Sequence, residues 1–328
     1  MSALLEVTNL RISLPGADGD VVIVDGIDFE VNSGQVFGLA GESGCGKTMT
    51  ALSLLRLLPA GARTSGRAVL DGRDLLTTSS RDLRKLRGRK LAMVFQDPAS
   101  SLHPMLTIER QMTEHLRAHL HMDQRQAHRR AVELLDEVRI PDPEAALRGY
   151  PHQFSGGMRQ RIQIAMALAC EPSLLIADEP TTALDVTVQA GILGLLDRLC
   201  RTTGLGVILI THDLGVLSAV SDTVTVMYAG RIVEAGPAAE VVRHTRHPYT
   251  RGLLDSLPHP DHVDQPLVPI GGMPPSPAAR PTGCAFHPRC RYVLEECRLR
   301  SPALLEVAPD HRTACPVDPL VRVAESIG

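Results

Sequence analysis

Residues 36–54 read Val-Phe-Gly-Leu-Ala-Gly-Glu-Ser-Gly-Cys-Gly-Lys-Thr-Met-Thr-Ala-Leu-Ser-Leu, and this stretch decides the fold. The apolar run from Val36 to Ala40 predicts a buried strand. The segment after it has the pattern Gly-x-x-x-x-Gly-Lys-Thr. Apolar residues at helical spacing then predict a helix that ends before Pro59. A strand, a glycine-rich loop and a helix in this order predict a phosphate-binding loop (P-loop).

Each residue type in this loop suits a nucleoside triphosphate. Glycines let the backbone aim its N–H groups at phosphate oxygens, and the helix adds the positive end of its dipole. Lys47 is expected to reach the β- and γ-phosphates, and the hydroxyl of Thr48 to bind Mg²⁺. The ATP-binding residues predicted in the loop are Gly41, Glu42, Ser43, Gly44, Cys45, Gly46, Lys47 and Thr48.

The composition argues against several classes of protein. A length of 328 residues allows one large domain with an appendage, or two domains. A net charge of −3, no Trp and 3% aromatic residues argue against a nucleic-acid partner. No apolar run approaches the ~20 residues of a membrane span, and the N-terminal residues lack a secretory signal. We expect a cytosolic protein that reaches a membrane only through partners.

Apolar strands and helices are predicted to alternate along the chain. Before the P-loop, residues 4–37 predict short strands with a turn at residues 15–20. Residues 107–148 are predicted to be helical throughout. Alternating strands and helices imply a parallel sheet covered by helices. Further predictions are strands at 91–95, 174–177 and 207–210, helices at 155–169 and 188–199, and a hairpin at 224–234.

Two acidic residues follow the predicted strand 174–177. Carboxylates at the end of a buried strand suit metal and water chemistry beside a bound phosphate. Asp178 is expected to hold Mg²⁺ through its water shell, because Mg²⁺ keeps several waters. Glu179 is expected to be the general base that activates the attacking water.

Four further segments complete a set in a fixed order. They are Gln96, Ser155-Gly156-Gly157-Met158-Arg159-Gln160, Ala183-Leu184-Asp185 and His212. Together with the P-loop and the acidic pair, they resemble the nucleotide-binding subunits of ABC transporters over about residues 4–236. The resemblance implies that Gln96 contacts Mg²⁺ and a transmembrane partner. It also implies that His212 lies near the γ-phosphate, which makes Glu179 and His212 the expected catalytic residues.

The resemblance also implies a fold and a dimer. The fold is an α/β, P-loop ABC-type nucleotide-binding domain with a RecA-like parallel core, an antiparallel β subdomain and a helical subdomain at about 97–165. This domain is expected to cover residues 1–244, before a Pro-rich extension at 245–328. In a head-to-tail dimer, the signature residues of one subunit would serve the ATP of the other. They are Ser155, Gly156, Gly157, Met158 and Gln160, with Asp185 in the D-loop, and the Mg²⁺ residues are Thr48, Gln96 and Asp178. The family's adenine-stacking aromatic is not matched, since Ser13 and Leu14 stand there.

The C-terminal tail indicates a particular group within this family. Residues 247–254 and 283–290 are similar to the C-terminal region of the oligopeptide/dipeptide/nickel importer ATPases. Four cysteines there have the spacing C-x5-C-x6-C-x17-C, which can supply thiolates to Zn²⁺ or to a [4Fe–4S] cluster, or stay unligated. The resemblance favours the [4Fe–4S] cluster, with zinc second, on Cys284, Cys290, Cys297 and Cys315.

The expected function is ATP hydrolysis that powers import of dipeptides or oligopeptides. The implied partners are a second ATPase, identical or homologous, two transmembrane permease subunits and, indirectly, an extracytoplasmic peptide-binding protein. The protein would then lie at the cytoplasmic face of the cell membrane. A nickel or other small-solute importer of the same family is an alternative. A soluble ABC ATPase is disfavoured by the single cassette without a basic stripe, and an exporter subunit by the cysteine-containing tail.

Overall fold

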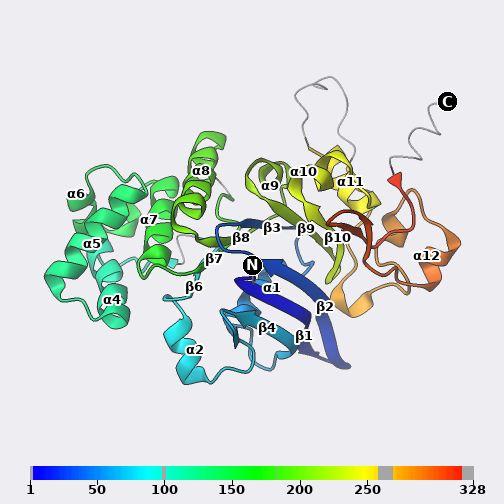
Figure 1. Ribbon diagram of the computed structural model, residues 1–328, viewed down its shortest axis with the longest axis horizontal. Helices are drawn as coiled ribbons and strands as arrows, with labels where there is room; N and C mark the ends of the chain where they lie inside the picture. Colours follow the sequence, from blue (N-terminus) through cyan, green and yellow to red (C-terminus); the bar gives the residue numbers. More distant parts are fainter. Residues whose placement is uncertain (1–2, 98–100, 183, 258–268, 320–328) are drawn as a thin grey trace. The chain divides into compact units, whose positions relative to one another are not determined.

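The computed structural model describes residues 3–97, 101–182, 184–257 and 269–319 (Figure 1). The chain divides into two compact units, which are described separately. One, here called the helical unit, comprises Met1–Leu5, Val31–Val36 and Leu70–Ile210. The other, here called the β unit, comprises Glu6–Glu30, Phe37–Val69 and Thr211–Gly328.

The helical unit contains a parallel sheet of three predicted strands. β6 (Leu91–Val94), β7 (Leu174–Asp178) and β8 (Gly206–Thr211) lie side by side, with β7 in the middle. Every residue of β7 and β8 is buried. Both faces of such strands are covered, which explains why the sequence shows continuous apolar runs there rather than alternation.

The helices of this unit gather into one group. Figure 1 shows α4 (Ile108–Leu120), α5 (Gln124–Glu137), α6 (Pro143–Arg148) and α7 (Gly156–Leu168) packed together. The prediction that residues 107–148 are helical throughout holds for most of this range, but the structure divides it into three helices with breaks between them. His121 takes a left-handed φ of 56°, and Asp123 then forms a capping box that starts α5. Asp142 caps α6 in front of Pro143.

Further elements complete the helical unit. None of the helices within the described ranges is both long and apolar enough to cross a membrane. The remaining elements are β5 (Arg73–Asp74), α2 (Ser80–Leu86), the 3-10 helix η1 (Pro151–Gln153) and α8 (Val186–Thr203).

A sheet with two long strands begins the β unit. Its strands follow the order β2 (Gly19–Val31), β1 (Leu5–Gly16) and β4 (Arg63–Leu70). The predicted turn between the two strands is present, but it covers only residues 17–18 rather than 15–20, so the prediction of short strands was wrong. β1 is long because alternate side chains, such as Leu10 and Ile12, stay buried along it.

The second sheet of the β unit includes part of the tail. β3 (Val36–Ala40) pairs in parallel with β9 (Thr223–Tyr228), and β9 forms the predicted hairpin with β10 (Arg231–Pro237). The tail strand β12 (His311–Thr313) pairs with β10, and β11 (Leu305–Ala308) pairs with β12. The described part of the Pro-rich tail thus adds two strands, β12 and β11, to this sheet.

Several helices accompany these strands. They are α1 (Lys47–Leu54), α9 (Leu214–Val220), α10 (Ala238–Arg243), α11 (Pro248–Asp255), α12 (Glu295–Leu299) and the 3-10 helices η3 (Pro277–Ala279) and η4 (His287–Arg289). Some of the tail's prolines (Pro258, Pro260 and Pro266) lie outside the described residues. The described part of the tail therefore contains helices and strands, which can place its side chains against the rest of the β unit.

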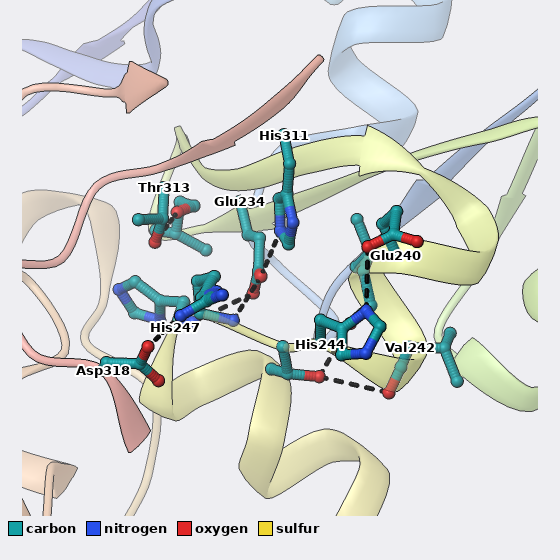
Figure 2. A network of polar contacts seen from close by, with 12 residues as sticks. Glu234, Glu240, Val242, His244, His247, His311, Thr313 and Asp318 are labelled. Atoms are coloured by element: carbon teal, nitrogen blue, oxygen red, sulfur yellow. Dashed lines mark hydrogen bonds and ion pairs between the residues drawn. The ribbon is translucent and has the colours of Figure 1, made fainter. Parts of the chain in front are cut away.

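A buried carboxylate anchors the tail to the hairpin (Figure 2). Glu234 on β10 is 0% exposed, and it accepts hydrogen bonds from the backbone N–H groups of Arg246 (2.6 Å) and His247 (3.1 Å). Its other contact is Nε2 of His311 on β12, at 2.8 Å. A buried carboxylate is tolerated only with such partners. The network fixes the start of α11 and the strand β12 to the same point of the hairpin.

Candidate nucleotide site

The P-loop lies between β3 and α1, as the sequence predicts. Gly41, Gly44 and Gly46 have φ angles of 145°, 81° and 109°, which favour glycine. A Cβ at residue 41 would also lie 2.3 Å from the carbonyl oxygen of Met227. These glycines allow the loop to turn back on itself against the neighbouring strand.

The start of α1 provides groups that suit an anion. Its N-cap residue Gly46 makes no side-chain hydrogen bond, so no side chain caps the first N–H groups of the helix. Lys47 is 5% exposed, and its ammonium donates to the carbonyl oxygens of Gly41 (2.7 Å) and Glu42 (3.1 Å). The loop's own backbone therefore fixes the position of this cation, while Thr48 beside it is exposed.

Cys45 closes the inner side of the loop. Burial raises the pKa of its thiol above the usual value, although the charge of Lys47 opposes the shift. The carbonyl oxygen of Cys45 accepts a 2.9 Å hydrogen bond from the N–H of Gly230, in the β9–β10 turn. The thiol is thus a neutral packing group. The β9–β10 hairpin supports the loop through the hydrogen bond from Gly230.

The helical unit brings the predicted glutamine and base together. Asp178 ends β7 and is 3% exposed. Glu179 follows it with a φ of 46°, a conformation that non-glycine residues adopt at a cost and that often marks functional sites. Oε2 of Glu179 accepts hydrogen bonds from Nε2 of Gln96 and from the hydroxyl of Thr182, both 2.8 Å long. No sequence motif includes Thr182, and its position three residues after Glu179 was the only available signal for this contact.

The predicted signature opens α7 in the same unit. Ser155 is the N-cap residue, and its hydroxyl accepts a 3.3 Å hydrogen bond from the N–H of Met158. A Cβ at residue 157 would lie 2.5 Å from Cγ1 of Val188, at the start of α8. The second glycine of the signature therefore also has a packing role, while Gln160 is 1% exposed in the first turns of α7.

The last two predicted segments lie at element ends. Asp185 caps α8 by accepting a 2.9 Å hydrogen bond from the N–H of Val188, while Ala183 lies outside the described residues. His212 is exposed in the loop that joins β8 to α9, and the next residue, Asp213, caps α9. The P-loop and His212 belong to the β unit, and the other predicted nucleotide residues belong to the helical unit. The roles assigned to all of these residues stay predictions.

The four tail cysteines line one cavity in the β unit. Burial raises the pKa of the Cys315 thiol to about 12, and the pKa values of Cys284 and Cys290 are also raised, chiefly by burial. Electrostatic interaction with the other three cysteines adds to the shift of Cys315. The described residues contain no group of three or more His, Cys, Asp or Glu that could hold a metal ion. The structure therefore brings the cysteines together without itself supporting a bound metal.

Comparison with protein families and curated proteins adds independent findings. The ABC transporter family model matches residues 24–182, and the model of the oligopeptide/dipeptide transporter C-terminal region matches residues 233–297. The oligopeptide transport ATP-binding protein OppD of Haemophilus influenzae is 46% identical over 91% of this chain and 93% of its own length. The dipeptide transport ATP-binding protein DppD of Bacillus subtilis is 45% identical over 96% of this chain and 95% of its own length.

Solved structures share the fold. The ATP-binding cassette MJ0796, solved as a dimer in a post-hydrolysis state with ADP and Pi, has a TM-score of 0.64 at 24% identity and covers 71% of this chain and 98% of its own. The structure of cbiO1 from Clostridium perfringens has a TM-score of 0.62 at 27% identity and covers 74% of this chain and 91% of its own. The fold is thus that of an ATP-binding cassette. The chain belongs to the ATP-binding proteins of ABC transporters that carry the oligopeptide/dipeptide C-terminal region, which confirms the predicted family.

Proposed function

We propose that this protein hydrolyses ATP to power the import of dipeptides or oligopeptides through an ABC transporter. The carboxylate of Glu179 carries the proposal, because Gln96 and Thr182 hold it in place directly after Asp178. A general base must be fixed in orientation to take a proton from water. The similarity to OppD and DppD supports peptides as the transported substrate.

The chain supplies groups for each part of the reaction. Backbone N–H groups of the P-loop and the ammonium of Lys47 would bind the phosphates, and His212 would orient the γ-phosphate. Glu179 would accept the proton of the attacking water. A hydroxyl, an amide and a carboxylate are ligands that suit Mg²⁺, so Thr48, Gln96 and Asp178 would hold it directly or through water. The metal would supply positive charge against the charge that develops on the phosphate oxygens.

The protein is proposed to act as a pair of cassettes. Ser155, Gly156, Gly157, Met158 and Gln160 would face the ATP of a second ATPase subunit, identical or homologous, and Asp185 would lie in the same interface. The dimeric structure of MJ0796 is consistent with such a pair. Two transmembrane permease subunits would hold the pair at the cytoplasmic face of the membrane, and an extracytoplasmic binding protein would deliver the peptide.

The four cysteines are proposed to hold a [4Fe–4S] cluster, with zinc as the second choice. All four line one cavity, and burial there raises the pKa of the Cys315 thiol to about 12. Such thiols become ligands only if bound metal stabilises the thiolates, and four thiolates match both groups. Bonds from the four thiolates to the metal would then stabilise the fold of the tail. Analysis of iron, acid-labile sulfide and zinc in anaerobically purified protein tests this, and a protein without any of the three contradicts it.

The substitution Glu179→Gln tests the proposed catalytic role. It keeps the size of the side chain but removes the base, so ATP binding should persist while turnover falls by about 100-fold or more. Glu133→Gln, at an exposed position of α5, is the matched control and should hydrolyse ATP at the wild-type rate. Both variants should be measured in the complex with the membrane subunits, together with uptake of a labelled peptide. Near wild-type turnover by Glu179→Gln would refute the assigned role.

A further inference from the structure

A side chain from the tail holds a side chain of the P-loop. Arg289 and Glu42 are 247 residues apart in the chain, yet Nη1 of Arg289 donates to Oε2 of Glu42 at 2.6 Å and Nη2 donates to Oε1 at 2.9 Å. The side chain of Arg289 is 4% exposed and that of Glu42 is 26% exposed. The hydrogen bonds to Glu42 raise the pKa of Arg289 above its ordinary value. This two-point geometry is the strong and directional form of an ion pair.

A second tail residue holds the backbone at the same position. The N–H of Glu42 donates a 2.8 Å hydrogen bond to the phenol oxygen of Tyr249, which is 0% exposed on α11. The ring of Tyr249 packs against Tyr228, with ring centres 4.6 Å apart, and against Phe286, at 5.3 Å. The tail therefore fixes both the backbone and the side chain of Glu42.

Both tail residues are themselves held by contacts with other groups of the β unit. Nε of Arg289 donates to the carbonyl oxygen of Gly271 at 2.9 Å, and its guanidinium lies 5.8 Å from the ring centre of Tyr228. Tyr249 comes two residues after His247, whose N–H is bound by the buried carboxylate of Glu234. Contacts of this kind lock side chains in one orientation. The Arg289–Glu42 pair thus connects the tail to the P-loop through fixed groups.

The position of Glu42 affects the groups that would meet a nucleotide. The ammonium of Lys47 donates to the carbonyl oxygen of Glu42, so a shift of this peptide would also move the lysine. The carboxylate of Glu42 carries a negative charge in a loop that would bind polyphosphate. Without Arg289, this charge would be unpaired and would repel the phosphates in a partly buried setting.

We propose that Arg289 and Tyr249 are positioning residues for the nucleotide, so that the cysteine-bearing tail sets the affinity of the P-loop for ATP. The inference rests on the proposed binding of ATP by this loop. Arg289 cancels the charge of Glu42 and holds its side chain, and Tyr249 fixes its N–H. A role confined to folding of the tail would instead change stability and leave the affinity of folded protein unchanged.

The test compares equilibrium binding of a fluorescent ATP analogue by full-length variants. Arg289→Gln should bind about tenfold more weakly than wild type, which corresponds to ~1.4 kcal/mol. Arg289→Lys should recover part of the loss, because it restores the charge but not the two-point geometry. The double variant Glu42→Gln/Arg289→Gln should recover most of it, because the unpaired carboxylate is gone. Tyr249→Phe, which removes only the hydroxyl, should weaken binding about threefold.

The control is Arg291→Gln. Arg291 lies two residues further along the tail and pairs with Asp255 at 2.8 Å, with 54% of its side chain exposed. The Arg291→Gln variant should bind the ATP analogue with the affinity of the wild-type protein. Melting temperature and iron content are measured on every variant, so that an unfolded protein or an altered cysteine site is recognised. If Arg289→Gln does not fold, Tyr249→Phe decides the question.

The outcomes separate the inference from the function on which it rests. Weak binding by Arg289→Gln with recovery in the double variant supports the inference. Equal affinity of folded Arg289→Gln, Tyr249→Phe and wild type overturns it, as does a double variant that binds no better than Arg289→Gln. Wild-type protein that binds no ATP analogue would instead contradict the proposed function.

Discussion

The side-chain amide of Gln96 donates a 2.8 Å hydrogen bond to the carboxylate of Glu179, a residue 83 positions further along the chain. β6 and β7 are neighbouring parallel strands, so the segments that follow them meet at one edge of the sheet. Thr182 donates to the same oxygen of Glu179. Two donors therefore fix the proposed base, at a residue whose backbone has a left-handed φ of 46°.

Thr182→Val tests whether this orientation matters for the reaction. The substitution removes one of the two hydrogen bonds to Glu179 and keeps the shape of the side chain. We expect kcat for ATP hydrolysis to fall about tenfold with little change in KM, because an interaction that orients the base acts in the transition state. Thr182→Ser keeps the hydroxyl and should retain most of the activity. Equal kcat for the valine and serine variants in the assembled transporter would contradict the role.

The signature glycine at position 157 is expected to resist substitution for a steric reason. In Gly157→Ala the new Cβ would meet Cγ1 of Val188 at 2.5 Å, so either the Val188 side chain or α7 and α8 must shift, at a cost of about 1–3 kcal/mol in unfolding free energy. Gly194→Ala on α8 meets no atom within 4 Å and should stabilise the protein by about 0.5–1 kcal/mol. Denaturant unfolding measures both changes.

A double variant separates the steric reason from other effects at this position. Val188→Ala removes the methyl group that the added Cβ would meet. If the clash is the cause, Val188→Ala should recover part of the stability lost in Gly157→Ala. A Gly157→Ala variant with wild-type stability would show that the helices accommodate the methyl group, and the steric explanation would fail.

The buried Glu234 is expected to be essential for docking of the tail. Glu234→Ala removes the acceptor for two backbone N–H groups and the partner of His311 (Figure 2). Because Glu234, His311 and the hydrogen bond from the N–H of His247 are buried, the loss should cost about 3 kcal/mol of unfolding free energy. The control Glu240→Ala breaks an exposed pair with His244 and should change stability by less than about 0.5 kcal/mol. Similar effects of the two substitutions on denaturant unfolding would contradict this prediction.

A pH dependence is expected from His128, which joins three helices. Its ring nitrogens lie 2.8 Å from a carboxylate oxygen of Glu109 on α4 and 3.1 Å from one of Glu144 on α6. The hydrogen bond to Glu109 is the largest cause that raises the pKa of His128 above its ordinary value of 6.5. Because the pKa of His128 is higher in the folded protein than in the unfolded chain, the charged imidazole stabilises the folded state at pH values below the unfolded pKa. This stabilisation is lost as the pH rises through the pKa of the folded state.

The variant His128→Gln checks this pH dependence. With about a third of the side chain exposed, the gain should be only about 0.5 kcal/mol. The variant should therefore be slightly less stable than wild type at pH 5.5, and the difference should shrink toward pH 9. Thermal unfolding at the two pH values measures this change, and a constant difference would contradict the charge-based explanation.

Much of the cassette could be predicted because its signals are local. Continuous apolar runs gave the strands around Leu174 and Ile208, and glycines with a lysine gave the P-loop between Val36 and Leu54. The breaks among α4, α5 and α6 were missed because the apolar spacing continues across them, while the stops come from His121 and from caps of one or two residues. The tail strands were missed because prolines dominate the composition there and β12 is only three residues long.

By itself, the sequence determined that this protein has a P-loop, an acidic strand end and the motif order of an ABC transporter ATPase, since each motif is a short run with its own chemistry. Only the tertiary structure decided that Thr182 supports Glu179, that β12 extends the hairpin and that Arg289 holds Glu42. The last two contacts join residues far apart in the chain. Packing of the whole β unit brings these residues together, and no local sequence pattern encodes that packing.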